Sequence, residues 1–75
     1  MKNNNLKIIL NNEIINIENI NSTHTVNFIK KNIYKLKGID IKKQKLFLNN
    51  VELKDNLKIR ELNIDFLDII LCTIF

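Results

Sequence analysis

The chain has 75 residues, of which 45% are hydrophobic and 27% are charged. This composition is typical of a folded globule, and the length allows one small domain over residues 1–75 but excludes a two-domain enzyme. One cysteine and one histidine cannot supply an internal disulfide or a four-ligand zinc site, so we expect no metal and no cofactor. The net charge of +4 permits an acidic partner without requiring nucleic acid.

The first expected elements are two strands joined by a tight turn. Apolar residues alternate along both segments with the period of a half-buried strand, and they are Leu6, Ile8, Leu10, Ile15 and Ile17. Asn11 and Asn12 lie between the segments, and asparagine tolerates the positive φ of a two-residue hairpin turn. This turn sets a register in which the alternating residues share one face and Ile9 meets Ile14 on the other. The alternation then breaks, which predicts a β-bulge near residues 18–19.

An amphipathic helix is expected to begin at Val26. Its apolar residues are three or four positions apart, and they are Val26, Ile29, Ile33 and Leu36. Thr25 suits the N-cap position. Gly38, the only glycine, suits the left-handed residue that commonly follows a helix.

The second half of the chain predicts three more strands. Residues 45–48 form the first, and Asn49-Asn50 provides a tight turn into a short strand over residues 51–53. Residues 54–65 suit only a short 3₁₀ turn. Residues 68–75 form the last strand, which is apolar on both sides: Ile70, Cys72 and Ile74 share one face, and Ile69, Leu71, Thr73 and Phe75 share the other. The expected order is β-β-α-β-β-β.

This pattern resembles the ubiquitin family from Thr25 to Phe75 without a gap. The matching features are a helix ending at Gly38-Ile39, a strand over residues 44–48, Leu53-Lys54-Asp55, and Ile59-x-x-Leu62-Asn63-Ile64. The resemblance implies an α+β fold of the ubiquitin-like β-grasp type. In this fold one main helix lies across a mixed sheet, and the first and last strands are its central parallel neighbours.

Three polar positions also follow the family. The resemblance implies that Lys30, Asp55 and Gln44 match a helix lysine, a loop acid and an interior glutamine that hold the helix against the sheet. Half-buried polar groups of this kind require partners. Without the resemblance, Lys30 reads as one more solvated lysine.

The resemblance also implies a partner-binding patch on the outer face of the sheet. The expected contact residues are Phe47, Leu71, Thr73, Ile9 and Asn50, with Asn11 at a position where ubiquitin has a leucine. Strand alternation independently directs Phe47 and Leu71 away from the helix. Large apolar patches of this kind usually mark a partner surface. The alternative is an error of register, which would make some of these residues part of the core.

No catalytic constellation is visible. Cys72 alternates inward, which predicts an inert thiol, and His24 has no acid or nucleophile motif beside it. Family members that are conjugated to other proteins end in Gly-Gly, whereas no glycine follows Gly38 here. We therefore expect a non-enzymatic interaction domain of a longer protein. It would dock on ubiquitin-binding domains or proteasome subunits in ubiquitin-linked protein turnover, with weak self-association through the apolar face as a further possibility.

Two alternatives remain open. The first is a protein modifier whose Gly-Gly tail lies outside this sequence. The second is a basic RNA-binding module that uses the lysines near the end of the helix, namely Lys30, Lys31, Lys35, Lys37, Lys42, Lys43 and Lys45. A single arginine and a tyrosine on the helix, Tyr34, argue against nucleic acid. No targeting segment or membrane-length apolar run is present, so the expected location is the cytoplasm and/or nucleus.

Overall fold

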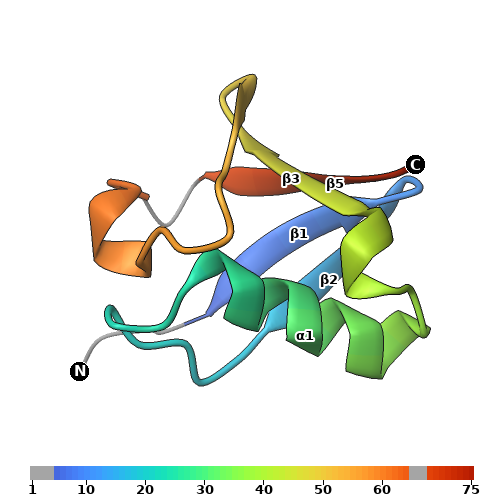
Figure 1. Cartoon of the computed structure of the whole chain (residues 1–75), viewed down its shortest axis with the longest axis horizontal. Helices are drawn as coiled ribbons and strands as arrows, with labels where there is room; N and C mark the ends of the chain where they lie inside the picture. The colour runs from blue at the N-terminus through green and yellow to red at the C-terminus, as the bar shows by residue number, and fades with distance from the viewer. Residues whose placement is uncertain (1–4, 65–67) are drawn as a thin grey trace.

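A computed structural model of the chain describes residues 5–64 and 68–75. One helix, α1 (Val26–Lys37), lies against one face of a five-stranded sheet with the strand order β2-β1-β5-β3-β4 (Figure 1). At the centre of the sheet, β1 (Leu6–Leu10) pairs in parallel with β5 (Ile69–Ile74), while the other pairs are antiparallel. This is the mixed β-grasp arrangement that the sequence predicts.

The first hairpin has the predicted register. β2 (Glu13–Ile17) pairs with β1 so that Ile8 faces Ile15 and Ile9 faces Ile14. The turn residues Asn11 and Asn12 have φ values of 51° and 65°. Two consecutive positive φ angles are typical of the type I′ turn, whose twist matches that of the flanking strands.

The predicted β-bulge at residues 18–19 is wrong. β2 ends at Ile17, and Asn19 adopts a φ of 61° in a bend. Asparagine reaches this left-handed conformation at low cost, so the chain turns out of the strand instead of kinking within it. The turn directs Ile20 back into the core, where it is buried.

The helix begins and ends as predicted. The Thr25 side chain accepts a hydrogen bond from the Phe28 amide, and Gly38 follows the last turn with a φ of 73°. The buried stripe consists of Val26, Ile29, Lys30 and Ile33. The prediction that Leu36 extends this stripe is wrong, because its side chain is 57% exposed. The stripe therefore ends about one turn before the helix does.

The start of the helix is held by a distant loop. The amides of Val26 and Asn27 have no partner within the helix. They donate to the carbonyl oxygens of Leu57 and Asp55, each at 2.9 Å. An isolated antiparallel bridge joins Thr25 to Lys58. Residues 55–58 thus fix the position of the N-terminus of α1.

The second half contains β3 (Gln44–Leu48), β4 (Val51–Glu52) and the 3₁₀ turn η2 (Ile59–Glu61), as predicted, except that β3 begins one residue earlier and β4 ends one residue earlier. A second 3₁₀ turn, η1 (Ile41–Lys43), was not predicted. The Asp40 carboxylate accepts a hydrogen bond from the Lys42 amide at 3.0 Å and so caps η1. An aspartate four residues before a strand gives only a weak signal for such a turn.

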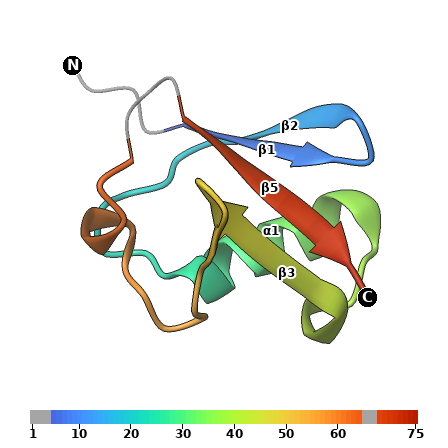
Figure 2. The same cartoon turned by 90° about the horizontal axis from the view of Figure 1, so that it is seen from above.

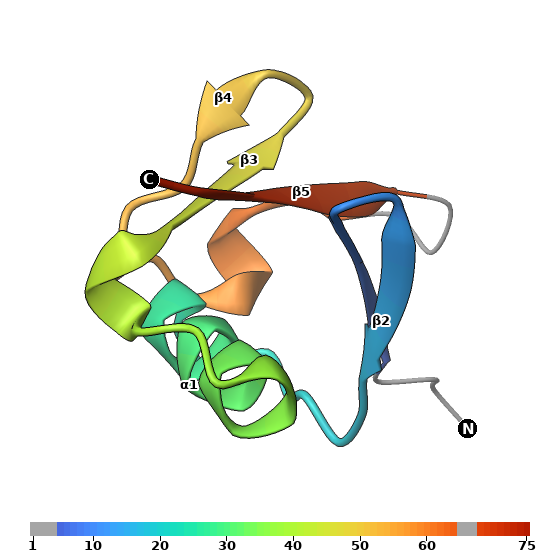
Figure 3. The same ribbon diagram turned by 90° about the vertical axis from the view of Figure 1, so that its right-hand side faces the viewer.

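The core lies between the sheet and α1. β5 passes between the β1–β2 hairpin and β3, with α1 beneath them (Figure 2), and the sheet arches over the helix (Figure 3). Ile70 and Cys72 face the helix and are buried, as predicted. The expectation that Ile74 joins them is wrong, because it pairs with Gln44 at the margin of the sheet and is 43% exposed. No helix in the described ranges is long and apolar enough to span a membrane.

The type I′ turn makes a prediction about stability. Asn12→Gly should raise the free energy of unfolding by about 0.5 kcal/mol, because glycine adopts positive φ without strain. Asn12→Ala should lower it by about 1 kcal/mol. Urea unfolding followed by circular dichroism measures both changes. Equal stabilities of the two variants would show that the turn does not hold this conformation in solution.

Candidate functional site

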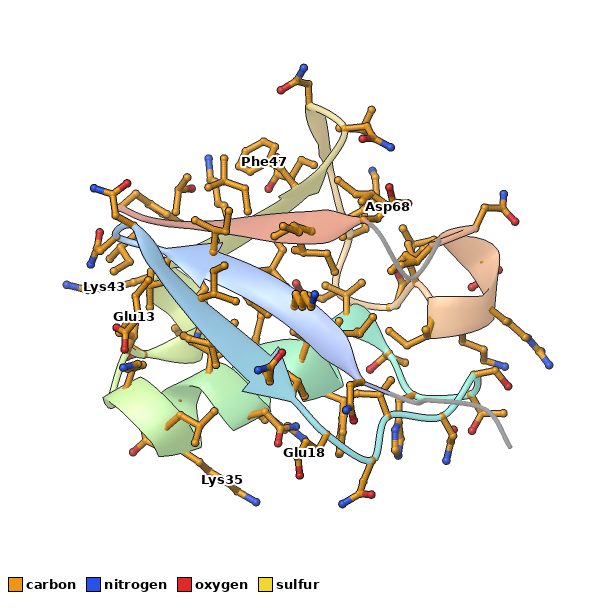
Figure 4. All side chains as sticks on the ribbon, turned by 180° about the vertical axis from the view of Figure 1, so that it is seen from behind. Glu13, Glu18, Lys35, Lys43, Phe47 and Asp68 are labelled. Carbon is orange, nitrogen blue, oxygen red and sulfur yellow. The ribbon has the colours of Figure 1, made fainter. Side chains whose placement is uncertain are left out.

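A row of apolar residues crosses the outer face of the sheet. Ile14 on β2 faces Ile9 on β1, Ile9 faces Leu71 on β5, and Leu71 faces Phe47 on β3. We call these four residues the outer row. Each is the sequence neighbour of a buried residue, so alternation directs it away from α1. Figure 4 shows Phe47 on the side of the sheet opposite the helix.

The outer row is exposed to solvent. Ile14 is 57% exposed and Leu71 is 44% exposed, while Ile9 and Phe47 are partly buried. Ile69, two residues before Leu71 on the same face, is 37% exposed. A contiguous apolar surface of this kind is uncommon on a monomer unless a partner covers it.

Charged side chains border the outer row. Lys7 pairs with Ile69 on one side of the row, and Lys45 pairs with Thr73 on the other side. The Lys45 Nζ atom lies 4.7 Å from the centre of the Phe75 ring. Glu52 on β4 faces Phe47 and closes one end of the row. The face is therefore an apolar band with a lysine on each long side.

The structure brings only part of the expected contact set together. Phe47, Leu71 and Ile9 are consecutive in the outer row. Thr73 lies two residues beyond Leu71 on the same face of β5, and Asn50 lies in the β3–β4 turn with a φ of 69°. The β3–β4 turn and the β1–β2 turn, which contains Asn11, lie at opposite ends of the sheet because β3 runs antiparallel to β5 and β1 runs parallel to it.

Ile14 belongs to the outer row but is not among the expected contact residues. The expected register already puts it opposite Ile9 on the outer face, whereas the resemblance to the family implies no contact at this position. Its apolar character on an edge strand was the signal available in the sequence.

The polar residues expected in the interior do meet. Lys30 is 7% exposed, and its Nζ atom lies 2.6 Å from Oδ1 of Asp55. The Asp55 carboxylate itself is largely exposed. The same residue accepts the amide of Asn27 through its main-chain oxygen. Asp55 thus holds the helix by its backbone and by its side chain.

Gln44 also holds α1 against the sheet, through hydrogen bonds to the middle of the helix and to the segment after it. Its side chain is buried, and Nε2 donates to the main-chain oxygens of Lys30 and Ile39, both at 3.0 Å. These bonds link the first residue of β3 to the middle of α1 and to the segment that follows the helix. They hold the helix against the sheet through Nε2, whereas the buried Oε1 atom of Gln44 has no hydrogen-bond partner among the described residues.

Neither residue considered for chemistry is placed as a catalyst. Cys72 is buried, and burial raises the pKa of its thiol, an effect opposed by the positive charge of Lys30. A thiol held in its neutral form is a poor nucleophile. The His24 ring stacks on Phe28 with centroids 3.9 Å apart, and its Nδ1 accepts a hydrogen bond from the Asn21 amide. Within residues 5–64 and 68–75, no three acids, histidines or cysteines form a metal-binding group.

The lysines do not form one nucleic-acid platform. Lys30 is buried against Asp55, and Nζ of Lys37 lies 2.8 Å from Oε2 of Glu13. Lys45 lies on the outer face, whereas Lys35 extends from the far side of the helix (Figure 4). Their charges therefore point in several directions.

The sequence matches the model of the ubiquitin family over residues 5–74. No curated protein matches it significantly.

Two solved structures are similar in fold. One is the solution NMR structure of the ubiquitin-like domain of the Arabidopsis thaliana protein At2g32350, with a TM-score of 0.84 and 20% identity, covering 99% of this chain and 79% of that chain. The other is ATBAG1 in complex with HSP70, with a TM-score of 0.84 and 17% identity, covering 93% of this chain and 39% of that chain. At these identities the likeness extends to the fold alone.

The Lys30–Asp55 pair makes a prediction about stability. Asp55→Ala should lower the free energy of unfolding by about 1–2 kcal/mol, because the buried ammonium loses its carboxylate. Lys30→Met should change it by less than about 1 kcal/mol, because an apolar side chain of similar volume needs no partner. Urea unfolding of the single and double variants measures the coupling. If Asp55→Ala lowers the free energy of unfolding as much in the Lys30→Met background as in the wild type, the pairing is contradicted.

Proposed function

The chain belongs to the ubiquitin family, and from this premise we propose that it is a non-catalytic interaction domain that docks on partner proteins through the outer row. The partners are receptors with ubiquitin-binding domains or proteasome subunits. The observation that carries the proposal is the apolar band on the outer face, in which Leu71 is exposed and its neighbours Ile9 and Phe47 are partly buried. The fold does not require an apolar surface here, because the core is built from the opposite face of the same strands.

A binding role fits the chemistry of the described residues better than catalysis does. The single thiol is buried, and the single histidine is held by a ring stack and a backbone hydrogen bond. Catalysis requires an accessible nucleophile, acid or base within reach of a substrate. The outer row instead supplies area, shape and lysines at its borders, which are the features of a docking surface.

We further propose that the domain is part of a longer protein that acts in ubiquitin-linked turnover, in the cytoplasm and/or nucleus. The same fold occupies 39% of the ATBAG1 chain, so it can serve as one unit of a larger molecule. The competing proposal is a modifier with a Gly-Gly tail. Reading the gene for a few codons beyond Phe75 decides between them, because Gly-Gly within about five residues would favour the modifier.

The outer row makes a prediction about binding. Phe47→Ala should weaken receptor binding by about 2 kcal/mol, or roughly thirtyfold, because Phe47 is the aromatic anchor of the row. Thr73→Ala, beside the row, should have much less effect. Isothermal titration against a panel of ubiquitin-binding domains measures the affinities, and circular dichroism checks that both variants remain folded. Equal effects of the two substitutions would contradict a docking site centred on Phe47.

A second copy of the chain is the other possible occupant of this face. Sedimentation of the wild type and Phe47→Ala tests it. Self-association of the wild type that is lost in Phe47→Ala, without receptor binding, would overturn the proposal.

A titration of RNA with wild-type protein tests the basic-module alternative, because binding through phosphates would weaken steeply as salt rises.

A further inference from the structure

The outer row continues beyond the expected contact set, onto the edge of the sheet. Ile14 lies on β2, which has β1 as its only neighbour among the described strands, and its side chain is 57% exposed. The adjacent residue, Ile15, makes the contact with the core. Ile14 therefore contributes apolar area to the outer face without serving the interior.

We propose that the partner surface extends across β1 to β2, with Ile14 as a binding residue, and that the partner presents a broad apolar surface formed by more than one helix. This inference rests on the proposed function, since it extends the same face. It adds a specificity-determining residue and the shape of the partner. Three observations carry it, namely the width of the outer row, the shape of the sheet and the charges on the borders of the row.

The width of the outer row exceeds what one helix covers. Neighbouring strands lie about 4.8 Å apart, so the four strands that carry the row span about 14 Å. A helix with its side chains is about 10 Å across, so one that runs along the strands covers about two of them. Two packed helices, whose axes lie about 8–10 Å apart, match the whole row.

The shape of the sheet disfavours a single helix laid across the strands. Each strand turns relative to its neighbour by about 20–25°, and β2 and β3 run in clearly different directions (Figures 2 and 3). The sheet also arches over α1, so its outer face is convex along the row. A straight helix on a convex face contacts the middle of the row and misses Ile14 or Phe47. A groove between two helices fits such a face better.

The charges define the chemistry of the partner. Lys7 and Lys45 lie on opposite sides of the row, and Lys7 is exposed. Glu52 lies at the β4 end of the row. At the β2 end, the residues that pair with β1 place no acidic side chain on the outer face. A complementary partner therefore carries an apolar groove bordered by acidic side chains.

The test uses Ile14→Thr, which keeps a β-branched residue on the strand, and Leu36→Gln as a matched control. Leu36 is also 57% exposed, but it lies on the helix, away from the row. Two probes are titrated, a three-helix ubiquitin-binding domain and a single-helix ubiquitin-binding peptide. Ile14→Thr should weaken binding of the three-helix domain about five- to tenfold and binding of the peptide less than about twofold. Leu36→Gln should change neither affinity.

The outcomes separate this inference from the proposed function. If Phe47→Ala weakens binding of both probes and Ile14→Thr weakens neither, the proposed function stands and the extension to β2 is wrong. If Ile14→Thr weakens binding of the peptide as much as that of the domain, a single helix reaches the edge and the two-helix partner is wrong. If neither probe responds to Phe47→Ala, both the proposed function and its extension fail. Thermal unfolding confirms that each variant is folded.

Discussion

The parallel pairing of β1 with β5 is the contact on which the rest of the structure depends. It joins segments about sixty residues apart and sets Ile8 beside Ile70 and Ile9 beside Leu71. The first of these pairs lies in the core, and the second lies in the outer row. A shift of one residue in this register would exchange the two faces. One pairing therefore decides both which residues pack on the helix and which residues form the outer row.

The contacts that hold α1 against the inner face of the sheet leave the outer face free. Apolar packing between the sheet and α1 is supplemented by Lys30 with Asp55 and by Gln44, and all three lie on the side of the helix. The loop over residues 55–58 accepts the first amides of α1. None of these contacts uses the outer row. Its residues can therefore vary with the partner while the fold is retained.

Local signals that agree with one another predicted most of the fold. The helix ends were predictable because Thr25 and Gly38 each satisfy a specific backbone requirement. Leu36 and Ile74 were misplaced because periodicity gives the direction of a side chain but not the point at which the neighbouring layer ends. Phe47 was expected in the patch from alternation and from the family. Ile14 was expected opposite Ile9, but its connection to Leu71 and Phe47 follows only from the pairing of β1 with β5 and of β5 with β3.

The central claim is that partners bind the outer row and not the lysine-rich side of α1. Amide chemical-shift mapping of isotopically labelled protein, titrated with ubiquitin-binding domains, tests it most directly. We expect the largest shifts at residues 9, 14, 47 and 69–73, on strands adjacent in the sheet. Shifts confined to residues 30–37 of the helix, with none on β3 and β5, would contradict it.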